Sequence, residues 1–486
     1  MLFLAAALLS ASVHLMGVAD AAPVPPSSPV VPVAVSSPVL AETPAVLGRA
    51  TPVRDEATAV DLGDCRAAEA TTFSAESCLD QLAGASSDRV VQFASTLDAD
   101  GDDVATLTAA VTAQEPATST ASWWQHVSTD RRAELVALLP GLVGNLEGVP
   151  YAVRDDANRV FLWGTTAAVA QRLDAGDGEA GDQERLAMLR QVRATLDGMT
   201  NDVPSAGAAS RHLVSLDTQM PGRAAVAIGD LDTADDVSVL VPGMLFTVSG
   251  QLVDWTNTAG ALYDEQTAWS ALLGRGGVET GSAPSVAVVS WMGYRTPDLT
   301  NFYDLGLADR GAAHLEDALS GLDAARAADP PRVSVMAHSY GSTTATIALS
   351  SHRVSVDSLV LLGSPGSVVS DAADLSVRGA DVYAAAGSFD PVAGSGFFGA
   401  DPATAAFGAV VLHMGGGDDT VTGRVLASAL GHNDYFKAGT ESMRSLALIG
   451  LGRGDLVDGR DGEPSTDGPE LPDITLVRPQ DVYLRD

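Results

Sequence analysis

Lysine is almost absent from this chain of 486 residues, in which Lys437 is the only one. Acidic residues dominate the charge, because Asp and Glu number 62 against 28 Lys and Arg, for a formal net charge of −34. A field of this sign repels nucleic acid phosphates and anionic lipid headgroups. The composition therefore excludes nucleic acid and anionic membrane surfaces as non-specific partners, and it favours a protein kept in solution by its acidity.

Cysteine is scarce as well, with Cys65 and Cys78 separated by twelve residues. An even number of cysteines in an exported chain predicts a disulfide bond. Closing so short a loop would constrain the unfolded chain by about 3 kcal/mol in the chain-entropy description. Neither cysteine has a histidine beside it, which argues against a metal site. Two free buried thiols are the alternative, and they fit an exported chain less well.

Long apolar runs are rare, and the one that stands out lies at the N-terminus. Residues 1–18 are apolar apart from Ser10, Ser12 and His14, and Ala19-Asp20-Ala21 follows as a small-x-small cleavage pattern. This combination predicts a secretory signal, although no Lys or Arg precedes the apolar run. Eighteen residues is also near the short limit for a membrane span, so an uncleaved anchor is the alternative. We expect cleavage near Ala21 and a protein that is secreted or associated with the cell envelope.

Composition and pattern divide the rest of the chain. Pro, Ser, Val and Ala without periodicity indicate an extended linker, and weak 3- and 4-residue spacing of apolar residues indicates helices after it. From Val237 onward, short β-branched strands alternate with helical patterns, which predicts an α/β fold with a mostly parallel sheet. The predicted segments are a signal peptide (1–21), a Pro/Ser-rich disordered linker (22–54), a helical region with the disulfide (55–122), an α/β domain (123–452) and an acidic flexible tail (453–486).

Six strands are predicted in the regular part of the α/β domain. They are 237–241, 286–291, 333–336, 358–362, 382–386 and 409–413, with a further strand at 223–229 and helices that include 131–139, 185–199, 312–328 and 344–350. Helices between strands of one sheet place the carboxyl ends of those strands at a common edge. Chemistry-bearing residues are therefore sought in the loops that follow these strands.

The stretch Arg332 to Thr343, R-V-S-V-M-A-H-S-Y-G-S-T, carries the clearest motif. A buried strand leads into Ala337-His338-Ser339-Tyr340-Gly341, and a helical run follows. This is the arrangement of a nucleophile elbow, in which Ser339 sits on a strained turn between nearly side-chain-free neighbours. Ala337 stands where the usual pattern has Gly, and Ala still fits. His338 occupies the variable position, where any residue is expected to serve. An ordinary Ser at a strand-to-helix turn is the alternative.

A serine nucleophile needs a base and a carboxylate that orients the base, and in elbow-type folds they follow in the order Ser, acid, His. Asp390 follows the strand 382–386, and His432 lies in the loop after the last strand, so Ser339, Asp390 and His432 are the predicted triad. Asp401 and Asp434 are the alternative acids, while Asp357 lies at the wrong end of its strand. The other histidines are expected to be structural, namely His14, His126, His212, His314, His352 and His413.

Backbone amides are expected to stabilise the developing oxyanion. One belongs to Tyr340, the residue after the nucleophile. The other is assigned to Met244, because the loop after strand 237–241 reads Pro242-Gly243-Met244-Leu245 and Gly243 lets the backbone turn inward. The mechanism these residues imply needs no metal and no cofactor.

Several separated segments together resemble the actinobacterial α/β-hydrolases of the DUF1023 type. The resemblance spans roughly residues 123–449 and includes Ser339, Asp390 and His432; its segments are VGNLEGVP (143–150), RDDANR (154–159), IGDLDTADDV (228–237), VPG (241–243), WMGYRTP (291–297), AHSYGS (337–342) and GSPG (363–366). The resemblance implies an α/β-hydrolase fold with a Ser-Asp-His triad, and it says little about the substrate.

The sequence thus predicts a secreted serine hydrolase acting on an ester or thioester of a small-molecule or lipid acyl substrate. Trp255, Trp269, Trp291, Phe302 and Tyr303 are candidates for an acyl pocket, with core packing as the default interpretation. Two alternatives stay open. One is a non-catalytic cell-envelope interaction protein on the same fold, and the other is a serine peptidase.

Overall fold

The computed structural model of the chain describes residues 62–66, 73–98, 101–200, 203–204, 209–276 and 283–457. The predicted signal peptide, the linker and residues 458–486 of the predicted tail lie outside the described residues. All described residues belong to one unit, Asp61–Asp486. Within the described ranges, no helix combines the length and the apolar character that crossing a membrane requires.

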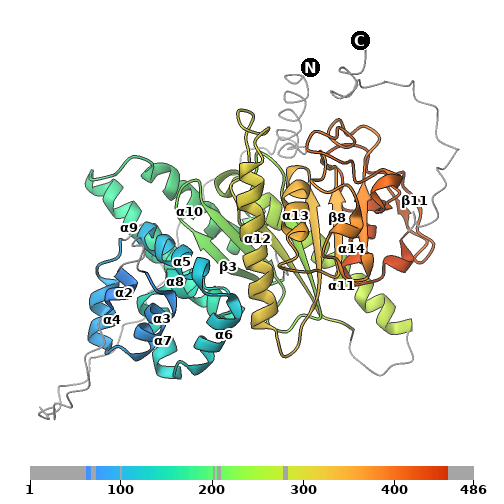
Figure 1. The fold of residues 1–486 in the computed structure, drawn as a ribbon. Coiled ribbons are helices and arrows are strands. Elements are labelled where there is room, and N and C mark those ends of the chain that lie inside the picture. Colours follow the sequence, from blue (N-terminus) through green and yellow to red (C-terminus); the bar gives the residue numbers. More distant parts are fainter. Residues whose placement is uncertain are drawn as a thin grey trace, which may run out of the picture. The chain divides into compact units, whose positions relative to one another are not determined.

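An eight-stranded sheet forms the centre of this unit (Figure 1). Its spatial order is β10-β9-β8-β7-β5-β6-β4-β3, and every pairing from β10 to β6 is parallel, while β4 and β3 are antiparallel additions. The prediction of a mostly parallel sheet is confirmed. The strands are β3 (Arg211–Asp217), β4 (Arg223–Ile228), β5 (Asp236–Val241), β6 (Val286–Met292), β7 (Arg332–His338), β8 (Ser358–Leu362), β9 (Val382–Ala385) and β10 (Val410–Val411).

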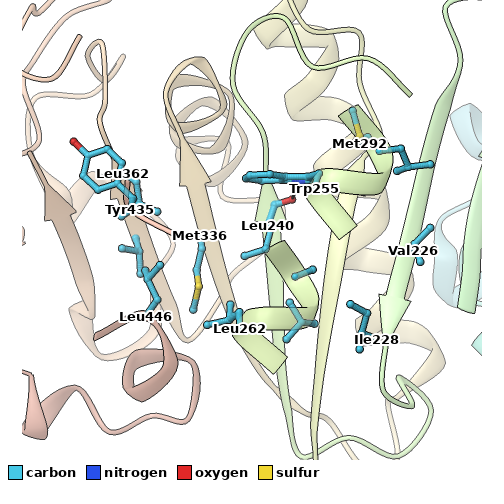
Figure 2. Packing of buried hydrophobic residues seen from close by; sticks show 14 of the residues in the cluster. Val226, Ile228, Leu240, Trp255, Leu262, Met292, Met336, Leu362, Tyr435 and Leu446 are labelled. Atoms are coloured by element: carbon cyan, nitrogen blue, oxygen red, sulfur yellow. Dashed lines mark hydrogen bonds between the residues drawn. The ribbon is translucent and has the colours of Figure 1, made fainter. Parts of the chain in front are cut away.

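Helices cover both faces of the sheet, which explains why the strands read as continuous apolar runs. On one face, α11 (Val248–Gly276) and α14 (Glu441–Gly450) pack with the strands in the cluster of which Figure 2 shows part. Leu240, Trp255 and Met336 meet there. On the other face, α12 (Gly306–Ala325) and α13 (Tyr340–Ser350) bury a second cluster with the same strands. Burial of this kind contributes about 25 cal/mol per Å² of apolar surface.

The region before the sheet is helical. One apolar cluster runs from Leu62 to Ala157, so the expected boundary after residue 122 falls inside helix α6 and inside a continuous core. The predicted bond between Cys65 and Cys78 is present, with an S–S distance of 2.02 Å. The helices are α2 (Gly63–Arg66), α3 (Ala75–Gly84), α4 (Ser87–Ala94), α5 (Asp102–Gln114), α6 (Ala117–His126), α7 (Thr129–Leu138), α8 (Pro140–Val143), α9 (Tyr151–Ala175) and α10 (Asp182–Leu196).

Side chains from the two N-terminal motifs of the resemblance bind the outer edge of strand β3. Asn145 donates to the Leu216 carbonyl (2.9 Å) and accepts from the Leu216 amide (2.8 Å). Asp155 accepts from the Leu213 amide (2.6 Å), and Asn158 donates to the Leu213 carbonyl (3.0 Å). These bonds replace the ladder that a further strand would supply, so the two motifs dock the helical region onto the sheet.

The shorter elements lie in loops. They are two-stranded sheets formed by β1 (Met199–Thr200) with β2 (Val203–Pro204) and by β11 (Gly417–Asp418) with β12 (Val425–Leu426), and 3-10 turns at Ala372–Asp374, Arg378–Ala380, Ala405–Phe407 and Gly454–Leu456. The last predicted strand, 409–413, is shorter than expected, because β10 comprises two residues before the chain turns away. The C-terminal loops that follow carry the predicted base.

Candidate functional site

Ser339 stands at the junction between β7 and α13 in a backbone conformation that L-residues rarely adopt. Its φ is 55° and its ψ is −129°, and its side chain is almost entirely buried. Such a conformation costs on the order of 1–3 kcal/mol and persists only where the surroundings enforce it. A hydrogen bond from the Ser339 amide to the Leu362 carbonyl (2.8 Å) anchors the turn to β8. Strand, strained serine and helix follow one another as a nucleophile elbow requires.

The two small residues that flank the elbow, Gly341 and Ala337, differ in whether their surroundings leave room for a methyl group. A Cβ on Gly341 would lie 2.4 Å from the Pro242 carbonyl oxygen, so the close approach of the loop after β5 requires glycine there. Ala337 is fully buried within β7, where its methyl group packs in the core on the α12 and α13 face. The departure from the usual glycine at this position is therefore accommodated.

Asp390 and His432 form a buried pair beside the elbow. The Nδ1 atom of His432 lies 2.9 Å from both carboxylate oxygens of Asp390, and the side chains are 6% and 0% exposed, respectively. Because Nδ1 faces only carboxylate oxygens, it carries the hydrogen, and Nε2 is left as the proton acceptor of the neutral ring. Among the candidate acids, Asp390 is the one that the structure places against His432.

Tyr435, which was not among the predicted site residues, completes the surroundings of the acid. Its hydroxyl donates to Asp390 Oδ2 (2.6 Å) and accepts from the Gly387 amide (2.8 Å). Burial would raise the pKa of Asp390, but the hydrogen bonds and the charge of His432, with the Tyr435 hydroxyl and the Val392 amide, hold that pKa below its ordinary value. Burial and the Asp390 charge raise the pKa of Tyr435, which therefore remains a donor. No short-range pattern in the sequence links Tyr435 to Asp390, which lies 45 residues earlier.

His338 has a specific partner, which the expectation that any residue serves at its position did not include. Its Nε2 lies 2.7 Å from the carbonyl oxygen of His432, and the two rings pack with centroids 4.6 Å apart. Burial lowers the pKa of His338, and the neighbouring His432 lowers it further. The neutral ring donates from Nε2, because a carbonyl oxygen can only accept. His338 thus ties the elbow to the loop that carries the predicted base.

Gly363, from the GSPG segment, brings the end of β8 against the acid and the base. Its φ is +57°, and a Cβ there would lie 2.6 Å from Asp390 Oδ2 and 3.0 Å from His432 Nδ1. A side chain at this position would separate the two groups. The glycine is needed for this close approach and for its left-handed backbone.

The loop after β5 passes directly over the elbow. A Cβ on Gly243 would lie 2.6 Å from Ser339 Cβ, so Met244 follows a residue that touches the serine. Tyr340, the other predicted amide donor, is the first residue of α13. The WMGYRTP segment braces the loop, because the Tyr294 hydroxyl donates to the Pro242 carbonyl (2.6 Å) and the Leu245 amide donates to the Pro297 carbonyl (2.9 Å).

The alternative residues have other partners. Asp401 accepts from the Ala403 amide and Asp434 from the Gly431 amide, each within its own turn. Asp357 pairs with Arg378. The remaining described histidines contact groups away from Ser339; they are His126 with the Ser122 carbonyl, His212 with Asp155, His314 with Arg223, His352 with Ser376 and His413 with Glu441.

A series of aromatic rings leads from the elbow to the surface. Successive ring centroids lie 5.4, 4.8, 5.8 and 6.0 Å apart along the path Tyr340, Phe398, Phe397, Phe302 and Tyr303. Tyr303 is 64% exposed and Phe397 is 40% exposed. We call these five residues the aromatic path. The other acyl-pocket candidates, Trp255, Trp269 and Trp291, are buried in the core, in line with the default interpretation.

The profile of a protein family described as "Alpha/beta hydrolase" matches residues 217–400. Uncharacterized protein Mb0988c of Mycobacterium bovis is 31% identical over 229 residues, which cover 46% of this chain and 80% of that protein. Uncharacterized protein Rv2079 of Mycobacterium tuberculosis is 29% identical over 390 residues, 70% of this chain, so the chain spans 57% of that relative's length. The chain belongs to the α/β-hydrolase family.

Solved structures with similar folds include two esterases. One is described as an arylesterase, with 10% identity and a TM-score of 0.31 over 61% of this chain and 97% of that one. Another is carboxyl esterase 2 of the fungus Tuber melanosporum, with 10% identity and a TM-score of 0.30 over 52% of this chain and 89% of that one. TM-scores this low support no conclusion about activity.

Proposed function

We propose that the chain is a serine hydrolase that cleaves an acyl ester or thioester. The observation that carries this proposal is the buried hydrogen-bonded pair of Asp390 and His432 beside a serine in a strained elbow conformation. Backbone strain and buried carboxylates with shifted pKa values cluster at active sites. Membership in the α/β-hydrolase family supports the proposal, and the narrower DUF1023-type assignment is part of it.

In the proposed reaction, His432 Nε2 removes the proton of the Ser339 hydroxyl while Oγ bonds to the acyl carbon. The carbonyl π bond breaks to give a tetrahedral oxyanion, held by the amides of Tyr340 and Met244. His432 then gives the proton to the leaving alcohol or thiol as the acyl–oxygen or acyl–sulfur bond breaks. Water, deprotonated by His432, releases the acid from Ser339. Asp390 stays ionised throughout and stabilises the imidazolium.

The aromatic path supports an apolar acyl group as the substrate class. The aromatic path begins at Tyr340, next to the nucleophile, and ends in exposed rings. An acyl chain bound along it would therefore bury apolar surface that is exposed to water in the free substrate. Each buried methylene would contribute about 0.8 kcal/mol. Secretion or cell-envelope association is a further part of the proposal, in keeping with the expected signal sequence, and a lipid acyl substrate fits such a location.

The test uses the protein lacking residues 1–21 and its Ser339→Ala variant, with Ser350→Ala, at the far end of helix α13, as a matched control. Wild type and control should react with a fluorophosphonate and hydrolyse p-nitrophenyl esters, and Ser339→Ala should do neither. Loss of a triad serine typically lowers turnover by several orders of magnitude. A folded wild type inert to both reagents would contradict the proposal and favour the interaction-protein alternative.

The substrate class is tested with esters of increasing chain length. Phe397→Ala should lower kcat/KM for the octanoate ester by roughly 10-fold, as expected for a few lost methylene contacts, and leave the acetate ester unchanged. Val425→Ala, a change at an exposed valine away from the aromatic path, serves as the control. Equal effects on both esters would contradict an acyl-binding role. Amide hydrolysis faster than ester hydrolysis would favour the peptidase alternative.

A further inference from the structure

A cavity of about 510 Å³ lies apart from the triad, on the α12 side of the sheet. Its walls come from α5, the chain around the start of α9, strands β3 to β6 and α12, and none of Ser339, Asp390 and His432 lines it. In Figure 1, α5 and β3 lie beside α12, on the side of that helix opposite α13. Small-molecule sites typically enclose roughly 300–1,000 Å³, so the cavity has the size of a ligand site.

Small and apolar side chains leave this space open. Along α5, Val104, Ala105, Thr108 and Thr112 lie on one face of the helix and line the cavity. Their short side chains cannot fill the gap between α5 and the sheet. The floor is apolar and includes Val214 from β3, Ala225 from β4, and Val289 and Trp291 from β6. An occupant therefore meets an apolar surface over most of its length.

The charged groups of the walls are paired with one exception. Arg223 binds Asp217 (2.6 Å), Arg154 binds Glu147 (2.6 Å), and Arg353 binds Glu316 (2.7 Å). Each of these arginines is thus neutralised by its own carboxylate, and every one of them lines the cavity.

The exception is Asp317, on the α12 wall. Within the described ranges, its carboxylate has neither an ion pair nor a hydrogen bond. When the three ion pairs, including the one that Glu316 forms with Arg353, are set aside, one negative charge of the walls is left without a partner. This charge is on Asp317, which lines the cavity.

Electrostatic surroundings make this carboxylate receptive to a cation. Burial raises the pKa of Asp317 to about 6, with further increases from Glu147 and Glu316 and opposing effects from Arg353 and Arg223. Above that pH the carboxylate is ionised in surroundings that disfavour its charge. A cation placed against it would relieve that cost, because an opposite charge within a few ångströms stabilises the ionised form.

We propose that this cavity binds an organic cation, a protonated amine on an apolar body, with its ammonium group at Asp317. The apolar body lies on the floor between α5 and α12, and the ammonium replaces the missing partner of the carboxylate. The site is independent of the proposed triad, so it stands or falls separately from the hydrolase activity. The strongly acidic chain would also concentrate cations near its surface.

The test is calorimetric titration of the full exported chain with n-octylammonium at pH 8, with octanoate as the matched anion. At that pH the probe is protonated, because alkylammonium groups have pKa values of about 10. The wild type should bind octylammonium in a saturable 1:1 manner and octanoate at least 10-fold more weakly. Asp317→Asn should weaken octylammonium binding at least 10-fold, and Asp309→Asn, on the same helix outside the cavity, should leave it unchanged.

A second variant tests the location of the site. Ala105→Trp, which places a large ring in the cavity from α5, should also abolish binding while Ser339 still reacts with a fluorophosphonate as in wild type. Asp317→Asn is expected to fold, because it removes a charge whose burial is unfavourable, and its melting temperature reports this directly. Binding that is absent in wild type, equal for octanoate, or unchanged in Asp317→Asn would overturn the proposal.

Discussion

His338 Nε2 and the carbonyl oxygen of His432 lie 2.7 Å apart and join two segments separated by 94 residues in the sequence. The bond runs from the residue directly before the proposed nucleophile to the main chain of the proposed base. The imidazole of His338 is buried, and its pKa is lowered by that burial, so it holds the base in place as a neutral donor. We interpret His338 as a positioning residue.

Replacing His338 by Ala should lower kcat/KM for ester hydrolysis by up to about 100-fold, since a displacement near 1 Å can cost that much. His338→Gln, which retains a donor, should recover most of the loss. The rate of fluorophosphonate labelling against pH provides the readout. A merely structural role would lower the melting temperature in both variants alike and leave the shape of the pH profile unchanged.

Tyr435→Phe removes the hydroxyl that stabilises the ionised Asp390. The folded-state pKa of Asp390 lies below its ordinary value of 3.8, so the group contributes stability that is complete above that pH and is lost as the pH falls toward the folded pKa. Without the hydroxyl this pKa should rise, because a hydrogen bond to a charged group contributes about 1.5–3 kcal/mol. Acid unfolding should therefore begin at higher pH in the variant.

The measurement is urea unfolding of wild type and Tyr435→Phe between pH 7 and about pH 2, which spans the folded-state pKa of Asp390. The difference in unfolding free energy between the two proteins should be largest at neutral pH. It should shrink as the pH falls and Asp390 becomes protonated in both proteins. A difference that does not depend on pH would mean that the hydroxyl acts only through the Gly387 amide.

Gly341→Ala and Ala337→Gly form a matched pair around the elbow. The alanine methyl at position 341 would clash with the Pro242 carbonyl, so the loop that carries Met244 must shift. Overpacking of this kind typically costs about 1–3 kcal/mol of stability, and turnover should fall with it. Ala337→Gly should retain turnover within a few-fold, as the kinetics of both variants with one p-nitrophenyl ester will report.

Arg154→Met should destabilise the fold by about 3 kcal/mol, because it leaves Glu147 without a partner in the wall of the cavity. The Arg154 side chain is 2% exposed, and its two guanidinium nitrogens lie 2.6 and 3.0 Å from the Glu147 carboxylate. Arg193→Met, at an ion pair that is more than half exposed on both sides, should cost less than about 1 kcal/mol. Similar losses in the two variants, measured by urea unfolding, would contradict this assignment.

The elbow and its partners were predictable because their chemistry is encoded locally and in chain order. Ser339 lies in one short stretch of strand, small residues and helix, and Asp390 and His432 each follow a strand of the predicted sheet. The roles of His338 and Tyr435 were not predictable, because each depends on a side chain meeting a group from a distant segment. No short-range pattern encodes such a contact.

Two elements escaped prediction for a related reason. Strand β3 carries polar residues at its ends and is stabilised by side chains of Asn145, Asp155 and Asn158 rather than by a strand on its outer side. Helix α14 contains Glu441 and Arg444, yet all ten of its residues are buried. Glu441 accepts from His413 and Arg444 pairs with Asp419, so both charged residues have ionic partners inside the protein. Tertiary pairing outweighs local polarity in both cases.

The docking of Asn145, Asp155 and Asn158 onto β3 also affects how molecules of this protein meet one another. An open strand edge is a template on which another chain can add a strand. At one edge of the central sheet, the free side of β3 is occupied by the side-chain amides of Asn145 and Asn158 and by the carboxylate of Asp155. At the other edge lies the two-residue strand β10, too short to guide an addition. The central sheet therefore offers little for edge-to-edge aggregation, even where many copies are crowded together.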